Sequence, residues 1–258
     1  MPLDHALGSP SWFELATTDQ SAAKRFYEAV FGWKAKDNAL PDGSVYTIFE
    51  LGGREVAACY TMMPEQAQAM RPAWGVYFRV ADADAAAAGV RAGGGQVITE
   101  PFEVMEHLRM AVCADPEGAM FSLHQARAHK GVAVIRENNA INWVELATRD
   151  IDKAEAFYRR LFGWETEDFP AGPTRYLLYG SRDAKWGGLL QMTPEWGDMP
   201  SHWSIYVQVE DVDATIARAT AAGGSVCVPP FDIPKVGRIA RIDDPSGAGF
   251  YLIAPNPN

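Results

Sequence analysis

Residues 12–19 read WFELATTD, and residues 143–150 read WVELATRD. The match continues into RFYEAVFGW at 25–33 and AFYRRLFGW at 156–164. Alternating apolar and polar residues, then a helix-capping Asp and an apolar pattern of helical period, predict a strand that leads directly into a helix. Because this strand and helix are written twice, the chain is predicted to be a duplication.

The repeat extends through the rest of each copy. Trp74 recurs as Trp203, and the turn DPEG at 115–118 recurs as DPSG at 244–247. Each pair keeps its order and nearly its spacing. With Phe26 and Phe157, the two tryptophans match the face that packs against the helices, so they are expected in the core.

The division between the copies is expected in a stretch that is polar at both ends. We predict a first module at residues 1–130, a second at 138–258 and a linker at 126–140. The short apolar run VAVI inside the linker is expected to form a strand or to pack between the modules.

Each module is predicted to be α+β and to contain two βαβββ units. Glycines and an Asp-Pro turn separate short β-forming runs from two helical patterns. In the first copy the expected elements after the opening strand and helix are strands near Tyr46–Glu50, Glu55–Met62 and Trp74–Val80, a helix at Asp82–Ala92, and strands near Gln96–Ile98, Arg109–Cys113 and Met120–His124. In the second copy helices are expected at about 150–162 and 211–222.

Composition narrows the possible partners. The 258 residues carry a net charge of −10 and no basic run, which argues against nucleic acid and against anionic membranes. The N-terminal sequence lacks the features of a signal peptide, and no apolar stretch is long enough to span a bilayer, so a cytoplasmic location is expected. The three cysteines, Cys59, Cys113 and Cys227, are expected to be buried and free.

The entries ELATTDQSAAKRFYEAVFGW and ELATRDIDKAEAFYRRLFGW, with YFRVADADA, YVQVEDVDA and the two Asp-Pro turns, resemble the glyoxalase/bleomycin-resistance/dioxygenase superfamily, also called the vicinal oxygen chelate fold. The resemblance covers almost the whole chain. It implies that paired βαβββ units form a curved, barrel-like mixed sheet with flanking helices around a small-molecule cavity, often with a metal. It also implies a monomer or a homodimer.

The resemblance further implies four inward-facing strand positions for His, Gln or Glu ligands. In this sequence three of the positions fall on Trp12 and Trp143, on Gly75 and Ser204, and on Ser122 and Tyr251. The remaining one falls near Glu55–Ala57 or Trp186–Gly188, with at most one carboxylate. His107, His124 and His202 lie within the modules, but none recurs in the other copy. We therefore expect no cofactor and no divalent metal, and loss of the family's metal chemistry.

Glu14 and Glu145 are the candidate catalytic residues. Side chains two apart in a strand share a face, so these glutamates should face the cavity together with Trp12 and Trp143. Burial would raise the pKa of such a carboxyl group and make it a proton acceptor or a ligand anchor. The alternative is a structural glutamate bonded to the backbone or to an arginine.

Further residues are candidates for binding a small molecule. Tyr77 and Tyr206 share the cavity face, and aromatic rings with polar tips are typical of small-molecule pockets. The alternative is that these rings fill the cavity. The complete predicted binding set is Trp12, Tyr77, Arg109, Trp143, His202, Tyr206, Arg238 and Tyr251.

Three functions follow as hypotheses. The first is a metal-free member that binds an aromatic or carbonyl-bearing molecule, as a binder or as a catalyst that uses a cavity glutamate. The second is a metal-dependent lyase or dioxygenase with rearranged ligands. The third is a non-catalytic interaction protein with filled cavities.

Overall fold

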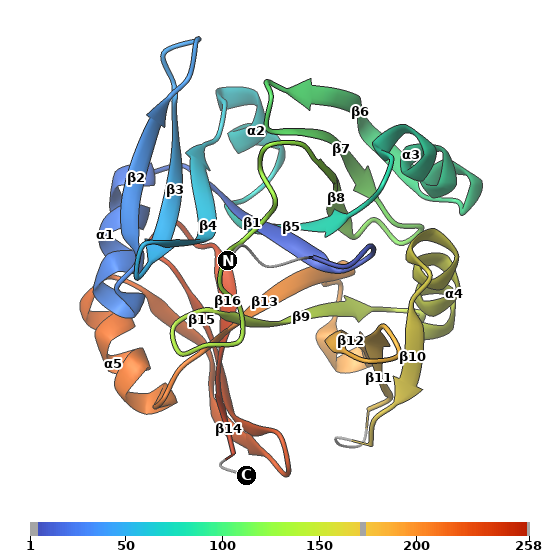
Figure 1. Ribbon diagram of the computed structural model, residues 1–258. Helices are drawn as coiled ribbons and strands as arrows, with labels where there is room; N and C mark the ends of the chain where they lie inside the picture. The colour runs from blue at the N-terminus through green and yellow to red at the C-terminus, as the bar shows by residue number, and fades with distance from the viewer. Residues whose placement is uncertain (1–4, 171–173, 257–258) are drawn as a thin grey trace.

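The structure is a computed structural model that describes residues 5–170 and 174–256. It confirms the α+β class and the two tandem modules (Figure 1). The first module contains β1 (Pro10–Thr17), α1 (Gln20–Phe31), β2 (Lys34–Ala39), β3 (Val45–Leu51), β4 (Arg54–Thr61), α2 (Pro64–Ala69), β5 (Ala73–Arg79), α3 (Ala83–Ala92), β6 (Gln96–Val104), β7 (Leu108–Ala114) and β8 (Met120–Ala126). The second contains β9 (Ile141–Thr148), α4 (Ile151–Phe162), β10 (Glu165–Asp168), β11 (Tyr176–Gly180), β12 (Lys185–Gln191), the 3₁₀ turn η1 (Pro194–Trp196), β13 (His202–Gln208), α5 (Val212–Ala221), β14 (Ser225–Ile233), β15 (Gly237–Asp243) and β16 (Gly249–Pro255).

Each module is built on one mixed eight-stranded sheet. The strand orders are β2-β3-β4-β1-β5-β8-β7-β6 and β10-β11-β12-β9-β13-β16-β15-β14, so the second sheet repeats the first. The opening strand of each module lies in the middle, parallel to one neighbour and antiparallel to the other. The sheets are curved but not closed, because among the described residues the two edge strands of each sheet do not pair with each other.

The repeated strand–helix entry forms as its sequence predicts. The Oδ1 atom of Asp19 accepts the N–H of Ala22 at 2.8 Å and caps α1, which satisfies one backbone donor at the helix start. Gly32 ends the helix with a φ of 73°, a conformation that glycine adopts without strain. Asp150 and Gly163 do the same for α4.

The modules pack through the sheet faces that also carry the helices. Phe78 of one sheet contacts Trp203 of the other, with ring centroids 5.0 Å apart. Helix α1 lies beside α5, and α3 lies beside α4 (Figure 1). The predicted core residues Phe26, Phe157, Trp74 and Trp203 are all buried, as expected.

The two Asp-Pro turns tie the modules together. The hydroxyl of Tyr27 donates to Asp244 at 3.1 Å, and that of Tyr158 donates to Asp115 at 3.0 Å. Each aspartate thus closes its own turn and accepts a hydrogen bond from a helix of the other module. The repeated motif therefore serves the interface as well as the turn.

Beyond Ala126, which ends β8, the linker forms no strand. It runs across the face of the first sheet that points away from the second module, which we call the outer side. In Figure 1 this is the inside of the curve of the upper module. The N–H of Ala133 donates to the carbonyl of Glu55 at 2.7 Å, and that of Val132 to the carbonyl of Ser11 at 2.9 Å. Val132 and Val134 are buried. The apolar run thus packs against the first module, whereas the prediction offered a strand or packing between the modules.

One cysteine differs from the expectation. Cys59 and Cys113 are buried and free, whereas Cys227 on β14 is free but exposed, so its predicted burial is wrong. β14 is an edge strand, and an edge strand leaves side chains in solvent even when they are small and apolar. Within residues 5–170 and 174–256, no helix combines the length and the apolar character that a membrane crossing needs.

Candidate small-molecule site

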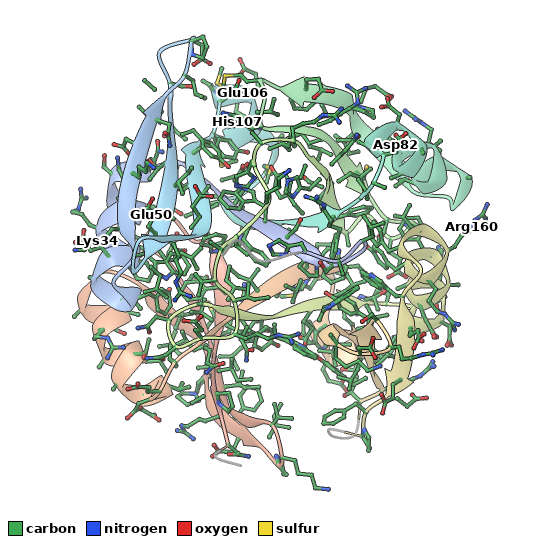
Figure 2. The ribbon with its side chains drawn as sticks, in the orientation of Figure 1. Lys34, Glu50, Asp82, Glu106, His107 and Arg160 are labelled. Carbon is green, nitrogen blue, oxygen red and sulfur yellow. The ribbon has the colours of Figure 1, made fainter. Side chains whose placement is uncertain are left out.

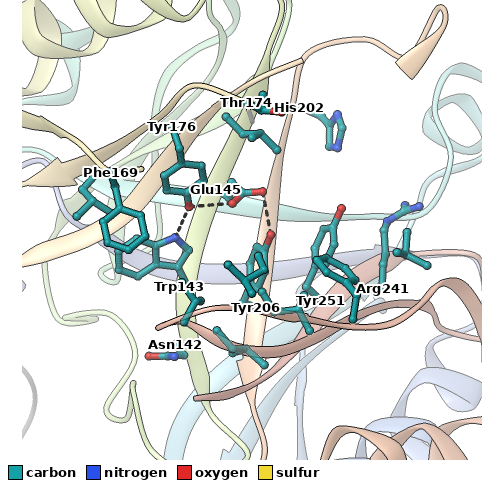
Figure 3. Close-up of a pocket in the computed structure, with 18 of the residues that line it drawn as sticks. Asn142, Trp143, Glu145, Phe169, Thr174, Tyr176, His202, Tyr206, Arg241 and Tyr251 are labelled. Atoms are coloured by element: carbon teal, nitrogen blue, oxygen red, sulfur yellow. Dashed lines mark hydrogen bonds between the residues drawn. The ribbon is translucent and has the colours of Figure 1, made fainter. Parts of the chain in front are cut away.

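Glu145 lies at the centre of a hydrogen-bonded network on the outer side of the second sheet (Figure 3). The hydroxyl of Tyr176 donates to its Oε2 atom and that of Tyr206 to its Oε1 atom, both at 2.8 Å. The indole N–H of Trp143 in turn donates to the Tyr176 oxygen at 2.9 Å. Tyr206 on the adjacent strand β13 and Tyr176 on the more distant strand β11 thus hold the carboxyl group from both sides.

The backbone of β12 leaves room for this network. The phenol of Tyr176, on β11, lies directly over Gly188, and a Cβ atom at that position would overlap the phenol. Gly188 stands opposite Glu145 in the parallel β9–β12 pair. The glycine therefore lets the tyrosine reach across the strand to the carboxylate.

The first module repeats the network. Tyr46 donates to Glu14 at 2.7 Å, Tyr77 donates to it at 3.1 Å, and Trp12 donates to Tyr46 at 3.0 Å. The structure therefore brings Trp12, Glu14 and Tyr77 together, as the alternation predicts. Sequence reasoning missed Tyr46 and its counterpart Tyr176, although both begin the matching segments YTIFE and YLLYG in the aligned copies.

Burial governs the proton affinity of both carboxyl groups. It raises the pKa of Glu145, and the hydrogen bonds from Tyr206 and Tyr176 offset part of that rise. The same causes raise the pKa of Glu14, with Tyr46 and Tyr77 as the donors. A carboxyl group with a raised pKa exchanges protons more readily near neutral pH, as a general acid or base requires.

A large pocket opens above the network of the second module. Its volume is about 940 Å³, within the range of pockets for drug-sized molecules. Its wall is mainly apolar and aromatic, with Glu145, His202 and Arg241 among its few polar side chains. The predicted residues Trp143, Glu145, His202, Tyr206 and Tyr251 all line it.

The corresponding side of the first module is covered by the linker. The ring of His129 lies against the indole of Trp12, with centroids 4.3 Å apart, and also near His124. Trp12 is 3% exposed, whereas Trp143 is only partly buried. The two copies therefore share a network but differ in what covers it.

The arginine candidates lie elsewhere. Arg109 donates from two nitrogens to Asp84, at 2.7 and 2.8 Å, and Arg238 donates likewise to Asp213, at 2.6 and 3.1 Å. Neither arginine lines the large pocket, and neither is the partner of a cavity glutamate. The two arginines recur because each copy has an ion pair between the strand that carries the arginine (β7 or β15) and the first turn of a helix (α3 or α5).

Two histidine candidates are also outside the large pocket. His107 lies beside Glu106 at the outer end of the first module, in the turn between β6 and β7 (Figure 2). His124 is buried, its Nδ1 atom is 2.8 Å from the hydroxyl of Ser11, and burial lowers its pKa to about 3.

The residues at the family's metal positions do not fit a metal. In the second module the indole nitrogen of Trp143 has no lone pair for a metal and donates its hydrogen to Tyr176. Tyr251 stacks on Tyr206, with centroids 4.5 Å apart. Across the described part of the chain, no three His, Cys, Asp or Glu side chains converge as a metal would need.

The fold and its paired strand–helix entries define the family. The family model of the Glyoxalase/Bleomycin resistance protein/Dioxygenase superfamily matches residues 3–123 and 140–252, and the chain belongs to this superfamily. The chain is 41% identical over 256 residues to "Putative glyoxylase CFP32" of Mycobacterium tuberculosis, with 98% of this chain and 97% of that protein covered. It is 36% identical over 259 residues to "Anthracycline biosynthesis protein DnrV" of Streptomyces peucetius, with 96% and 94% covered.

Solved structures show the same fold. The Mn(II)-bound glyoxalase from Novosphingobium aromaticivorans superposes with a TM-score of 0.64 at 15% identity, covering 96% of this chain and 82% of that one. A variant of homoprotocatechuate 2,3-dioxygenase from B. fuscum gives a TM-score of 0.65 at 15% identity, covering 98% and 73%. At this identity the likeness concerns the fold alone.

Proposed function

We propose that the second module binds a planar, largely apolar molecule that carries a carbonyl group, and that Glu145 acts on it as an acid or base without the family's metal. The observation that carries the proposal is the position of Glu145. It is the carboxyl group held by two tyrosines on the floor of an apolar pocket of about 940 Å³.

The proposed chemistry is a proton transfer next to a carbonyl group. The carboxylate of Glu145 takes a proton from the carbon beside the carbonyl, and the resulting acid returns a proton to the substrate. The hydroxyls of Tyr176 and Tyr206 hold the carboxyl oxygens in place, and the apolar wall excludes water. We expect no metal at this site, so the proposed step relies on the glutamate.

Relatives support the class of ligand. The name of the Streptomyces peucetius protein places that protein in anthracycline biosynthesis, and anthracyclines are polycyclic aromatic carbonyl compounds. The pocket of the present chain offers several aromatic faces for such a ring system, among them Trp143, Tyr206 and Tyr251.

The first module has a different proposed role. The ring of His129 covers Trp12, which favours the hypothesis of a filled, non-catalytic cavity for this copy. We propose the modules as residues 1–130 and 138–258 with the linker at 126–140, in a cytoplasmic monomer or homodimer. We also propose that Glu14 has a structural role.

Deuterium incorporation tests the catalytic proposal. 2-Tetralone has acidic C–H bonds beside a carbonyl and two fused rings, and its exchange in D₂O is read by mass spectrometry. We expect the wild-type protein to accelerate exchange and Glu145→Gln to reduce the acceleration by about 100-fold or more. Glu14→Gln is the matched variant of the other module and should keep the wild-type rate.

Two results would contradict the proposal. One is full acceleration by Glu145→Gln; the other is loss of acceleration in Glu14→Gln alone. A metal assay separates the metal-dependent alternative: treatment with EDTA should leave the exchange rate unchanged, and a rate that returns only on adding Zn²⁺, Ni²⁺, Fe²⁺ or Mn²⁺ would support that alternative instead.

A further inference from the structure

Arg241 is a cationic side chain on the wall of the large pocket. It lies on β15, opposite Tyr251 of β16, and both residues line the pocket (Figure 3). Its guanidinium lies over Gly249, and a Cβ atom at that position would overlap the guanidinium. The glycine thus lets the cation extend across β16 toward the middle of the sheet.

The guanidinium has donors to spare. Its ion-pair partner in the described residues is Asp243, with the Nη2 and Oδ1 atoms 3.6 Å apart, longer than a hydrogen bond. Asp243 itself accepts a hydrogen bond from the thiol of Cys227 at 2.9 Å. By contrast, Arg238 on the same strand is bonded at close range to Asp213 and Asp232. Arg241 is therefore free to bind a group inside the pocket.

The strand register sets the distance from Arg241 to Glu145. Ser204 on β13 stands opposite Glu145 on β9. In the parallel β13–β16 pair Tyr206 stands opposite Tyr251, so Ser204 and Gly249, two residues earlier on each strand, lie at the same level. Two strand spacings of about 4.8 Å therefore give roughly 10 Å between Glu145 and the guanidinium that lies over Gly249. That gap matches the length of two or three fused rings.

Other groups near the guanidinium complete this end of the pocket. The Nδ1 atom of His202 lies 2.8 Å from the carbonyl of Pro200, to which it donates, so the Nε2 atom of this pocket-lining residue is an acceptor. Burial lowers the pKa of His202, which keeps the ring neutral. The remaining charged lining residues, Glu195 and Lys235, are exposed. Arg241 is therefore the cation of the inner wall.

The first module lacks this arrangement. Val112 takes the matching place on β7, opposite Ser122, and Met120 takes the place of Gly249. The cation and the glycine that accommodates it thus occur in the module with the large pocket and not in the covered one.

We propose that Arg241 binds an anionic group of the ligand, so that the ligand is a planar acid of two or three rings. This inference rests on the proposed function. The acid group pairs with the guanidinium, the rings lie along the stacked pair Tyr206 and Tyr251, and the far end reaches Glu145.

Two matched dyes test the proposal. 8-Anilinonaphthalene-1-sulfonate and N-phenyl-1-naphthylamine share their rings, and only the first carries a sulfonate; both fluoresce on entering apolar pockets. We expect the wild-type protein to bind the sulfonate roughly 10- to 100-fold more tightly, the gain of a charge-assisted hydrogen bond in a partly buried site. Arg241→Gln should remove this preference and leave the affinity for the neutral dye unchanged.

Three variants sharpen the result. Arg241→Lys should retain part of the preference because it keeps the charge. Gly249→Ala should reduce the preference by displacing the guanidinium. Arg218→Gln removes the same charge from α5, where the side chain bonds to Thr215, and should change neither affinity.

The outcomes separate this inference from the proposed function. Leu190 lines the pocket, so Leu190→Trp should weaken both dyes. The neutral dye can bind and remain sensitive to Leu190→Trp while the wild-type protein shows no preference for the sulfonate, or a preference that survives Arg241→Gln. Either result would overturn only the role of Arg241. Failure of both dyes to bind, or binding indifferent to Leu190→Trp, would contradict the pocket itself.

Discussion

The imidazole of His129 stands edge-on against the indole of Trp12, at 82° between the ring planes and 4.3 Å between centroids. His129 belongs to the linker, and its Nε2 atom is also 3.4 Å from Glu55. The chain thus places one of its own rings where the second module has open space beside Trp143. The networks around Glu14 and Glu145 are nearly identical, and their surroundings differ because the linker covers the first one.

Removal of this ring should open the first module. His129→Ala deletes a side chain that packs against Trp12, and we expect a loss of about 1–3 kcal/mol in the free energy of unfolding. N-phenyl-1-naphthylamine should then bind at two sites per chain instead of one. Urea denaturation and dye titration measure both effects. Lys130→Ala, at the exposed neighbouring residue, should show neither.

Loss of the bridging tyrosine should destabilise either module but affect ligand binding in only one. Tyr176→Phe leaves the indole N–H of Trp143 without its acceptor and removes one of the two tyrosine donors to Glu145, and it should cost about 1–3 kcal/mol in chemical denaturation. Tyr46→Phe removes the same bonds from the first module and should cost a similar amount. Dye affinity should fall only in Tyr176→Phe; an equal fall in both would contradict a single open pocket.

The raised pKa of Glu145 predicts a pH-dependent stability. Its stabilising contribution is fully present below the pKa of the unfolded chain and is lost as the pH rises through the higher folded pKa, because the folded protein holds the proton more tightly. Glu145→Gln removes this dependence, so wild type should lose stability relative to the variant as the pH rises from the ordinary pKa of glutamate through the raised pKa of the folded protein. Each unit of pKa difference is worth about 1.4 kcal/mol. Parallel stability curves for the two proteins would show that the pKa is not raised.

The three cysteines should react in two classes. Cys227 is exposed, whereas burial raises the pKa of Cys59 and that of Cys113 to about 12 each. We expect Ellman's reagent to modify one thiol in the native protein and three after unfolding in guanidinium chloride. Cys227→Ser should abolish the native reaction. Rapid modification of a second thiol in the native protein would contradict the buried positions.

The two surface arginines should matter little. Arg109 and Arg238 form solvent-screened ion pairs with Asp84 and Asp213, and such pairs contribute little to stability. Arg109→Gln and Arg238→Gln should therefore leave the free energy of unfolding almost unchanged. A substantial loss of dye affinity in either variant would restore them as binding residues.

Much of the site follows from local patterns. The strand alternation of WFELATTD and WVELATRD predicts that Trp143 and Glu145 share a face, and the structure places both on the pocket. Tyr206 and Tyr251 follow from the same two-residue period. The arginines were misleading, because parallel repetition preserved an ion pair as faithfully as it would preserve a binding residue.

The sequence by itself determined the duplication, the order of elements and the residues that alternate onto one face, because these depend on short-range periodicity and on comparison of the two copies. The tertiary structure decided which copy is open. The linker covers the first sheet, Tyr176 reaches Glu145 over a glycine, and Arg241 reaches inward over Gly249. Each of these contacts joins different strands or segments, and its formation depends on how the chain packs in space.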